Sequence, residues 1–143
     1  MSKILIVHTS WYKEYIDMMV DTASHILNES NFSINFSCAP GAIELAALAK
    51  NKILVKKQVP EQANDYVGVL FLGIVIRGGT SHYELVTNEA FRSIGSLAMD
   101  FPEISIINNI ICVENQGQLE ERIEKNTQNN TRALVDLINE KSS

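Results

Sequence analysis

The feature that most constrains this sequence is an apolar run at residues 67–76, which ends in the hydrophilic segment 77–82. The run lacks the alternation of polar and apolar residues that marks a strand with one face in water, so it predicts a strand covered on both faces. Strands of this kind are typical of parallel sheets with helices on either side. The run therefore favours an α/β fold with this strand near its centre.

The segment that follows this strand has a composition that suits an anion. Gly78 and Gly79 precede Thr80, Ser81 and His82, and the apolar residues after them have helical spacing. Glycines allow backbone amides to turn toward one point, and a helix N-terminus adds positive potential. The same pattern also fits a plain connection between a strand and a helix, so the local residues leave both interpretations open.

The rest of the chain alternates between strand patterns and helix patterns. Apolar runs predict further strands, and apolar residues three to four positions apart predict helices between them. Right-handed crossovers place such helices on both faces of one parallel sheet. We therefore expect one domain over residues 1–143, built as a three-layer α/β/α sandwich with a four-stranded parallel sheet. The expected strands are 3–8, 32–38, 67–76 and 103–113, and the first and third helices are 14–27 and 82–99.

Two segments are expected to depart from this regular pattern. Residues 51–65 carry lysines and a proline, which predicts an extended surface connection with a strand-like or helical piece. Residues 125–130 should interrupt the last helix, because Asn and Thr side chains compete for backbone hydrogen bonds. The sequence thus predicts a helix that opens at 114–123 and resumes at 131–141.

Distinctive side chains follow the end of every predicted strand. Trp11, Glu44, His82 and Glu114 come after the first, second, third and fourth strand, and ligands of parallel sheets bind at that edge. Trp11 either stacks on a ring or caps the core, and the cap is favoured because aromatic side chains bury large apolar areas. Glu44 either complements the dipole of its helix or binds a ligand. Their shared edge favours a ligand site.

Charge and cysteine content exclude several classes of function. The formal net charge is −5 at pH 7, which argues against broad binding to nucleic acid or anionic membranes. No stretch approaches the roughly 20 apolar residues of a membrane helix, and the start of the chain lacks a signal-peptide pattern. We expect a soluble, cytoplasmic protein.

Cys38 and Cys112 lack metal-type spacing and are expected to be buried thiols in a reducing compartment.

Four blocks of residues resemble the lumazine synthase family, in the same order and over essentially the whole chain. The resemblance implies a flavodoxin-like fold and condensation of 5-amino-6-(D-ribitylamino)uracil with 3,4-dihydroxy-2-butanone 4-phosphate. The product is 6,7-dimethyl-8-ribityllumazine, formed in the penultimate step of riboflavin biosynthesis, and neither a metal nor an organic cofactor takes part. The blocks are residues 11–12, 40–44, 72–83 with 88–90, and 114–115 with Gln118 and Arg122.

The resemblance also implies a role for individual residues. His82 would transfer protons, and Gly79, Thr80 and Arg122 would hold the phosphate. In the family the groups of the fourth strand and fourth helix come from a neighbouring subunit. Two substrates held together beside one imidazole form a sufficient apparatus for imine formation, phosphate elimination and ring closure. The uracil and ribityl side would contact Trp11, Ala42, Ile43, Glu44, Ile74, Val75, Ile76 and Asn108.

The chain departs from the family pattern at two places. An aromatic residue is usual where this chain has Asn108, and its loss removes stacking of about 0.5 to 1.5 kcal/mol. Lysines with glycines are usual in the segment that is 126–131 here. These departures motivate an alternative, a non-catalytic shell protein that binds lumazine or flavin. A flavodoxin or phosphoacceptor receiver domain is disfavoured, because residues 9–12 contain neither a phosphate loop nor an acidic cluster.

The resemblance finally implies a homo-oligomer with active sites between subunits. Family members form pentamers, some of which assemble into an icosahedral shell. The short N-terminal segment and the absence of glycine at 126–130 favour a free pentamer. Riboflavin synthase is a candidate downstream partner.

Overall fold

The computed structural model describes residues 1–59 and 65–143, which form a four-stranded parallel sheet with the strand order β2-β1-β3-β4. The strand predicted to be central, β3, lies between β1 and β4, so that prediction is confirmed. The strands are β1 (Lys3–Thr9), β2 (Ser33–Ala39), β3 (Tyr66–Ile76) and β4 (Ser105–Val113).

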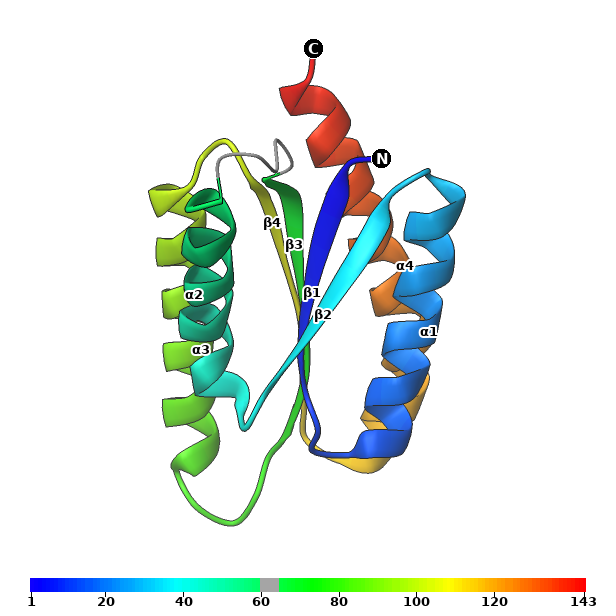
Figure 1. Ribbon diagram of the computed structural model, residues 1–143. Helices are drawn as coiled ribbons and strands as arrows, with labels where there is room; N and C mark the ends of the chain where they lie inside the picture. Colours follow the sequence, from blue (N-terminus) through cyan, green and yellow to red (C-terminus); the bar gives the residue numbers. More distant parts are fainter. Residues whose placement is uncertain (60–64) are drawn as a thin grey trace.

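Helices cover both faces of this sheet (Figure 1). Helices α1 (Lys13–Glu29) and α4 (Gln116–Lys141) lie on one face, and α2 (Leu45–Lys57) and α3 (His82–Asp100) lie on the other. A short 3-10 helix, η1 (Ala42–Glu44), precedes α2. The expected flavodoxin-like sandwich of three layers is confirmed. No helix within residues 1–59 and 65–143 is both long and apolar enough to cross a membrane.

The apolar run of β3 contributes to two separate cores. Leu70 and Leu72 pack against α1 and α4, whereas Val69 and Phe71 pack against α2 and α3. All four side chains are fully buried. Successive side chains of a strand point to opposite faces, so both faces must be apolar when helices cover both. This explains why the sequence of the strand shows no alternation.

The last helix is continuous from Gln116 to Lys141, so the predicted interruption at 125–130 is wrong. Two polar side chains of this segment bind Asn109 of β4. Asn109 Nδ2 donates to Thr127 Oγ1 at 3.0 Å, and Asn130 Nδ2 donates to Asn109 Oδ1 at 2.7 Å. Because Asn109 satisfies these groups, they do not compete for the helix backbone. Thr131 Oγ1 donates to the Thr127 carbonyl at 2.6 Å, a bond compatible with the helix.

A glycine lets the second half of α4 lie close to the sheet. A Cβ atom at Gly68 would lie 3.0 Å from Ile138 Cδ1 and 3.1 Å from Leu134 Cδ1. Both distances are shorter than ordinary van der Waals contact, so a Cβ atom at this position would require the ends of these two side chains to shift by a few tenths of an ångström. Gly68 therefore permits the contact between α4 and β3.

Helix α2 is longer than the sequence predicts. The helical piece expected within the surface connection at 51–65 is present at residues 51–57, where it continues α2 to Lys57. The reason is that Ile53 follows Ala49 by one turn and is buried with it under the sheet, which extends the apolar face of the helix. Residues 60–64 of the expected connection lie outside the described residues.

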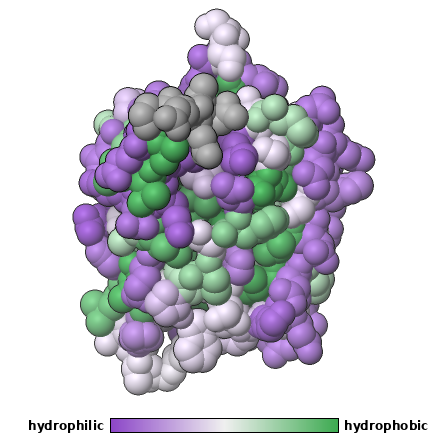
Figure 2. Space-filling model, in the orientation of Figure 1, coloured by the Kyte–Doolittle hydropathy of each residue, from purple (hydrophilic) through white to green (hydrophobic). Residues whose placement is uncertain are grey.

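The prediction of two buried thiols is also wrong. Cys38 is exposed, and Cys112 is partly buried. The strand that carries Cys38, β2, is an edge strand of the described sheet, so its side chains are covered less completely than those of β1 and β3. On the same strand Phe36 is 50% exposed. Figure 2 shows apolar side chains gathered between the helical layers, in the region where β2 crosses in Figure 1.

Candidate active site

A cleft of about 480 Å³ opens at the carboxyl end of the sheet. Four segments form its walls: the loop after β1, the connection after β2, the end of β3 and the first turns of α3. The helices that follow β1 and β3 lie on opposite faces of the sheet, so the cleft lies at the point where ligands of such sheets bind. Its lining residues are Trp11, Tyr12, Pro40, Gly41, Ala42, Ile43, Glu44, Ile74, Val75, Ile76, His82 and Val86.

The aromatic wall of the cleft comes from the loop between β1 and α1. Trp11 is 66% exposed, so its predicted role as a cap over the core is wrong. Its Nε1 donates to the carbonyl oxygen of Pro40 at 2.9 Å. Tyr12 adopts left-handed backbone angles, with φ of 60°, which turn the chain sharply into α1. The indole ring is thus held by its edge while its faces remain accessible.

The second wall is the short helix η1 and the start of α2. Glu44 is the N-cap residue of α2, but its side chain makes no capping hydrogen bond. A Cβ atom at Gly41 would lie 2.9 Å from Glu44 Oε1, so the glycine makes room for this carboxylate. Ile43 is 47% exposed and adds an apolar surface. Glu44 therefore retains acceptor capacity at the edge of the cleft.

His82 is the first residue of α3 and lines the cleft from the opposite side. Its backbone N–H donates to Thr80 Oγ1 at 3.2 Å, which fixes the start of the helix. Val86 lies one turn further along the same side of α3 and also lines the cleft. Val86 is not among the residues predicted from the sequence, although its spacing of four residues from His82 places it on the same side of the helix.

The residues predicted to hold phosphate are not all brought together. Gly79 and Thr80 are exposed in the loop before α3, beside the cleft. Backbone amides at a helix N-terminus are suited to an anion. Arg122, in contrast, is exposed on α4, which covers the other face of the sheet. Within one chain the arginine is not among the residues that line the cleft.

Asn108 also does not line the cleft. It lies on the edge strand β4, and its Oδ1 accepts a hydrogen bond from the backbone N–H of Ile110 at 2.8 Å. Its side chain is partly buried and already has this partner.

Arg77 binds two carboxylates at the edge of the cleft region. Its Nε lies 3.0 and 2.8 Å from the two carboxylate oxygens of Glu114, and its Nη1 donates to Glu84. Its guanidinium carbon also lies 4.2 Å from the centre of the Tyr83 ring. Hydrogen bonds to Glu84 and Glu114 hold the pKa of Arg77 above its ordinary value. The hydrogen bond from Arg77 in turn lowers the pKa of Glu84.

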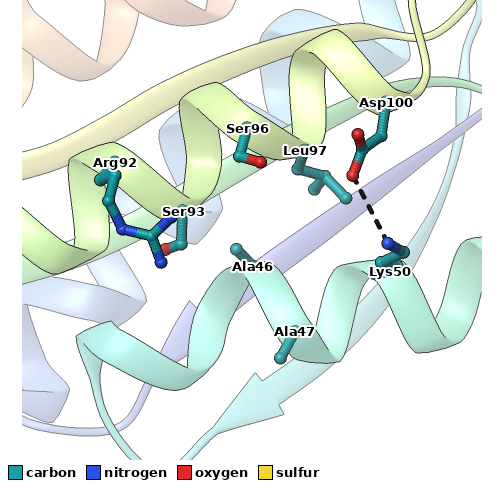
Figure 3. Close-up of a pocket in the computed structure, with 8 residues that line it drawn as sticks. All are labelled: Ala46, Ala47, Lys50, Arg92, Ser93, Ser96, Leu97 and Asp100. Carbon is teal, nitrogen blue, oxygen red and sulfur yellow. Dashed lines mark hydrogen bonds and ion pairs between the residues drawn. The ribbon is translucent and has the colours of Figure 1, made fainter.

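A smaller groove of about 190 Å³ lies between α2 and α3. Figure 3 shows Lys50 of α2 pointing across this groove to Asp100 of α3, and their Nζ and Oδ2 atoms are 3.4 Å apart. Arg92, at the other end of the groove, pairs with Glu89. The charged groups are therefore already paired with other side chains, and the residues that line the groove include no histidine.

Comparison with known proteins adds a second line of evidence. A family model described as 6,7-dimethyl-8-ribityllumazine synthase matches residues 1–142. The chain belongs to the lumazine synthase family. A 6,7-dimethyl-8-ribityllumazine synthase of Novosphingobium aromaticivorans is 37% identical over 119 residues, which cover 82% of this chain and 78% of the relative. A protein of Rhizobium meliloti named 6,7-dimethyl-8-ribityllumazine synthase 1 is 35% identical, over 80% of this chain and 72% of the relative.

The substrates of a lumazine synthase are small organic molecules, and the composition of the cleft suits them. One wall is an exposed indole, the floor is the apolar end of β3, and the polar groups are Glu44 and His82. A cleft with apolar walls and few polar groups is typical of small-molecule sites. In residues 1–59 and 65–143, no group of three or more His, Cys, Asp or Glu side chains could hold a metal ion.

Proposed function

We propose that the cleft between Trp11 and His82 is the site at which this lumazine synthase condenses 5-amino-6-(D-ribitylamino)uracil with 3,4-dihydroxy-2-butanone 4-phosphate. The single observation that supports this assignment most is that one cleft collects side chains from the ends of three strands and the start of α3. Apart from Asn108, the residues predicted for the uracil side all line it together with His82.

The uracil substrate is proposed to lie between the aromatic wall and the apolar floor. The accessible face of Trp11 can stack on the pyrimidine, and Ile74, Val75 and Ile76 offer the apolar contact beneath it. Ala42, Ile43 and Glu44 form the remaining wall, where the Glu44 carboxylate can accept hydrogen bonds from the ribityl hydroxyls. This placement holds the amino group of the substrate in the middle of the cleft.

The phosphate of the second substrate is proposed to bind at Gly79 and Thr80. These residues precede α3, where backbone amides and the helix dipole favour an anion. A phosphate at this position brings the carbonyl of the butanone between the uracil amine and His82. The amine can then form an imine with loss of water, after which phosphate is eliminated. Attack of the ribitylamino nitrogen on the remaining carbonyl carbon closes the ring with loss of a second water. His82 would carry the protons in these steps.

We also propose that the active oligomer is a pentamer in which Arg122 and Asn108 reach the cleft of a neighbouring chain. This proposal is supported by the position of Arg122 on α4, which covers the face of the sheet opposite α3. Arg122 is therefore not placed with Gly79 and Thr80 of its own chain. A ring of identical contacts gives every chain one complete site. We further propose that residues 1–143 act as one domain in the cytoplasm and that riboflavin synthase uses the product.

Mixed oligomers test the shared site. Chains with His82→Ala and chains with Arg122→Ala are co-expressed with different tags and purified through both tags. Random mixing pairs an intact His82 with an intact neighbouring Arg122 at roughly a quarter of the sites. We expect lumazine fluorescence to form at roughly that fraction of the unmodified rate, when the butanone phosphate is below saturation. Activity no higher than that of the separate variants would contradict the shared site.

The non-catalytic alternative has no support in the structure or in the relatives. It rests on Asn108 and on the missing lysines of segment 126–131. The relatives from Novosphingobium aromaticivorans and Rhizobium meliloti are both named as synthases. Turnover of both precursors by the purified chain without added metal distinguishes the two functions directly.

A further inference from the structure

Arg77 connects three segments around the proposed site. Its backbone N–H donates to the carbonyl oxygen of Val113 at 2.9 Å. Its side chain binds Glu84, in the first turn of α3, and Glu114, which immediately precedes α4. The end of β3, the start of α3 and the start of α4 are thus held by one residue.

The loop that Arg77 spans has few other restraints. Residues 77–81 are exposed, and a Cβ atom at Gly78 or Gly79 would find no atom within 4 Å. Apart from the bonds of Arg77, one side-chain hydrogen bond restrains this loop in the described part of the chain. It joins the backbone N–H of His82 to Thr80 Oγ1. The ion pair between Arg77 and Glu84 joins the two ends of the loop. The position of the loop therefore depends strongly on Arg77.

The surroundings of Arg77 argue against direct binding of phosphate. Two carboxylates already occupy the guanidinium, which lies over the ring of Tyr83. Tyr83 borders a different groove, with Phe91 and Cys112, whereas His82 lines the cleft. The Nε and Nη1 groups of Arg77 are therefore already paired with carboxylates.

We propose that Arg77 is a positioning residue that sets where His82 and the amides of Gly79 and Thr80 lie relative to the cleft. The inference rests on the proposed function of the cleft. Arginine is suited to the task because its planar fork can bind two carboxylates at once, which a lysine ammonium cannot reproduce in the same geometry. Displacement of reacting groups by about 1 Å can cost on the order of a hundredfold in rate.

Kinetics of four variants test the proposal: Arg77→Gln, Arg77→Lys, Glu84→Gln and Glu114→Gln. Arg77→Gln is expected to lower kcat by between about ten- and a hundredfold. Arg77→Lys should recover little of this loss, although it keeps the charge. Arg92→Gln is the control, because it removes an exposed arginine–carboxylate pair within α3 and outside the cleft, and its kcat should stay unchanged.

Glu84→Gln separates positioning from phosphate binding. If Arg77 positions the loop, Glu84→Gln lowers kcat in the same direction, and the double variant with Arg77→Gln is no slower than Arg77→Gln alone. If Arg77 instead binds phosphate, Glu84→Gln releases the guanidinium, lowers the KM for the phosphorylated substrate and leaves kcat intact. The second result would overturn the proposal. Glu114→Gln provides the same comparison from the other carboxylate.

Amide hydrogen exchange tests whether Arg77 restrains the loop, independently of any measurement of activity. Amides in a peptide that covers residues 77–84 should exchange faster in Arg77→Gln and at the unmodified rate in Arg92→Gln. The kcat of His82→Ala is measured in parallel. If His82→Ala keeps the kcat of the unmodified protein, the proposed site is wrong. If His82→Ala is slow while Arg77→Gln and Glu84→Gln keep the unmodified kcat, the site stands and the inference about Arg77 is wrong.

Discussion

Trp11 Nε1 donates a hydrogen bond of 2.9 Å to the carbonyl oxygen of Pro40. This bond joins the loop after β1 to the segment after β2 and fixes the only tryptophan of the chain at the rim of the cleft. The side chain is nevertheless 66% exposed. An aromatic ring held at one edge and open on its faces is suited to stacking.

Because the chain has one tryptophan, its fluorescence should report binding in the cleft. We expect the emission of Trp11 to be quenched as 6,7-dimethyl-8-ribityllumazine is titrated into the protein. Replacement by alanine should raise the KM for the uracil substrate about two- to tenfold, as expected from the loss of a stacked pair. Trp11→Phe should keep most of the affinity. Unchanged emission at product concentrations that inhibit turnover would contradict this position of the ligand.

His82→Ala should lower kcat by about a hundredfold or more, because a positioned proton-transfer group contributes an effect of that size. The chain offers a matched control in His25, an exposed histidine of α1 that pairs with Glu29. His25→Ala should leave both kcat and KM unchanged. Steady-state assays of lumazine formation check the pair, and equal rates for the two variants would remove His82 from the mechanism.

Asn109→Ala should destabilise the protein by about 1 to 3 kcal/mol, because it leaves buried polar groups without partners. Thr127 is completely buried and receives its hydrogen bond from Asn109. Asn129→Ala, at an exposed position of the same helix, should change stability by less than about 0.5 kcal/mol. Urea unfolding at one fixed protein concentration compares them, and equal midpoints would show that the network contributes nothing.

The two cysteines should differ in reactivity toward iodoacetamide at pH 8. Burial raises the pKa of Cys112 from 9.0 to about 11, so its thiol stays protonated, whereas Cys38 is exposed. Because the folded pKa of Cys112 is the higher one, its contribution to stability is present below pH 9 and is lost as the pH rises through about 11. Intact mass should show a single adduct, which Cys38→Ser abolishes. Rapid modification of Cys112 in the folded protein would contradict the expected protection.

Features that depend on neighbouring residues in the sequence could be predicted, and features set by distant contacts could not. The β3 strand could be predicted because its own residues, 67–76, form the apolar run that indicates a buried strand. The continuity of α4 could not be predicted, because the hydrogen-bond partner of Thr127 is Asn109, which lies on β4. Likewise the exposure of Cys38 follows from the edge position of β2, which the order of strands along the chain does not reveal.

The same distinction holds for the candidate site. Trp11, Glu44 and His82 each follow a strand, and the ends of parallel strands meet at one edge of a sheet. Their proximity was therefore predictable from order alone. The pairing of Arg77 with Glu84 and Glu114 could not be predicted, because the motif around Gly78 and Gly79 indicates only that the segment suits an anion.

The side chain of Asn108 has a consequence for how these molecules can associate. An open edge of a sheet usually offers N–H groups that can recruit a further strand and lead to aggregation. On β4 one such donor, the N–H of Ile110, is already bound by Asn108 Oδ1. The ladder is thereby closed at this point by its own sequence. A strand added by another chain would have to displace Asn108 to pair at this point, which disfavours fibre growth by strand addition along this edge.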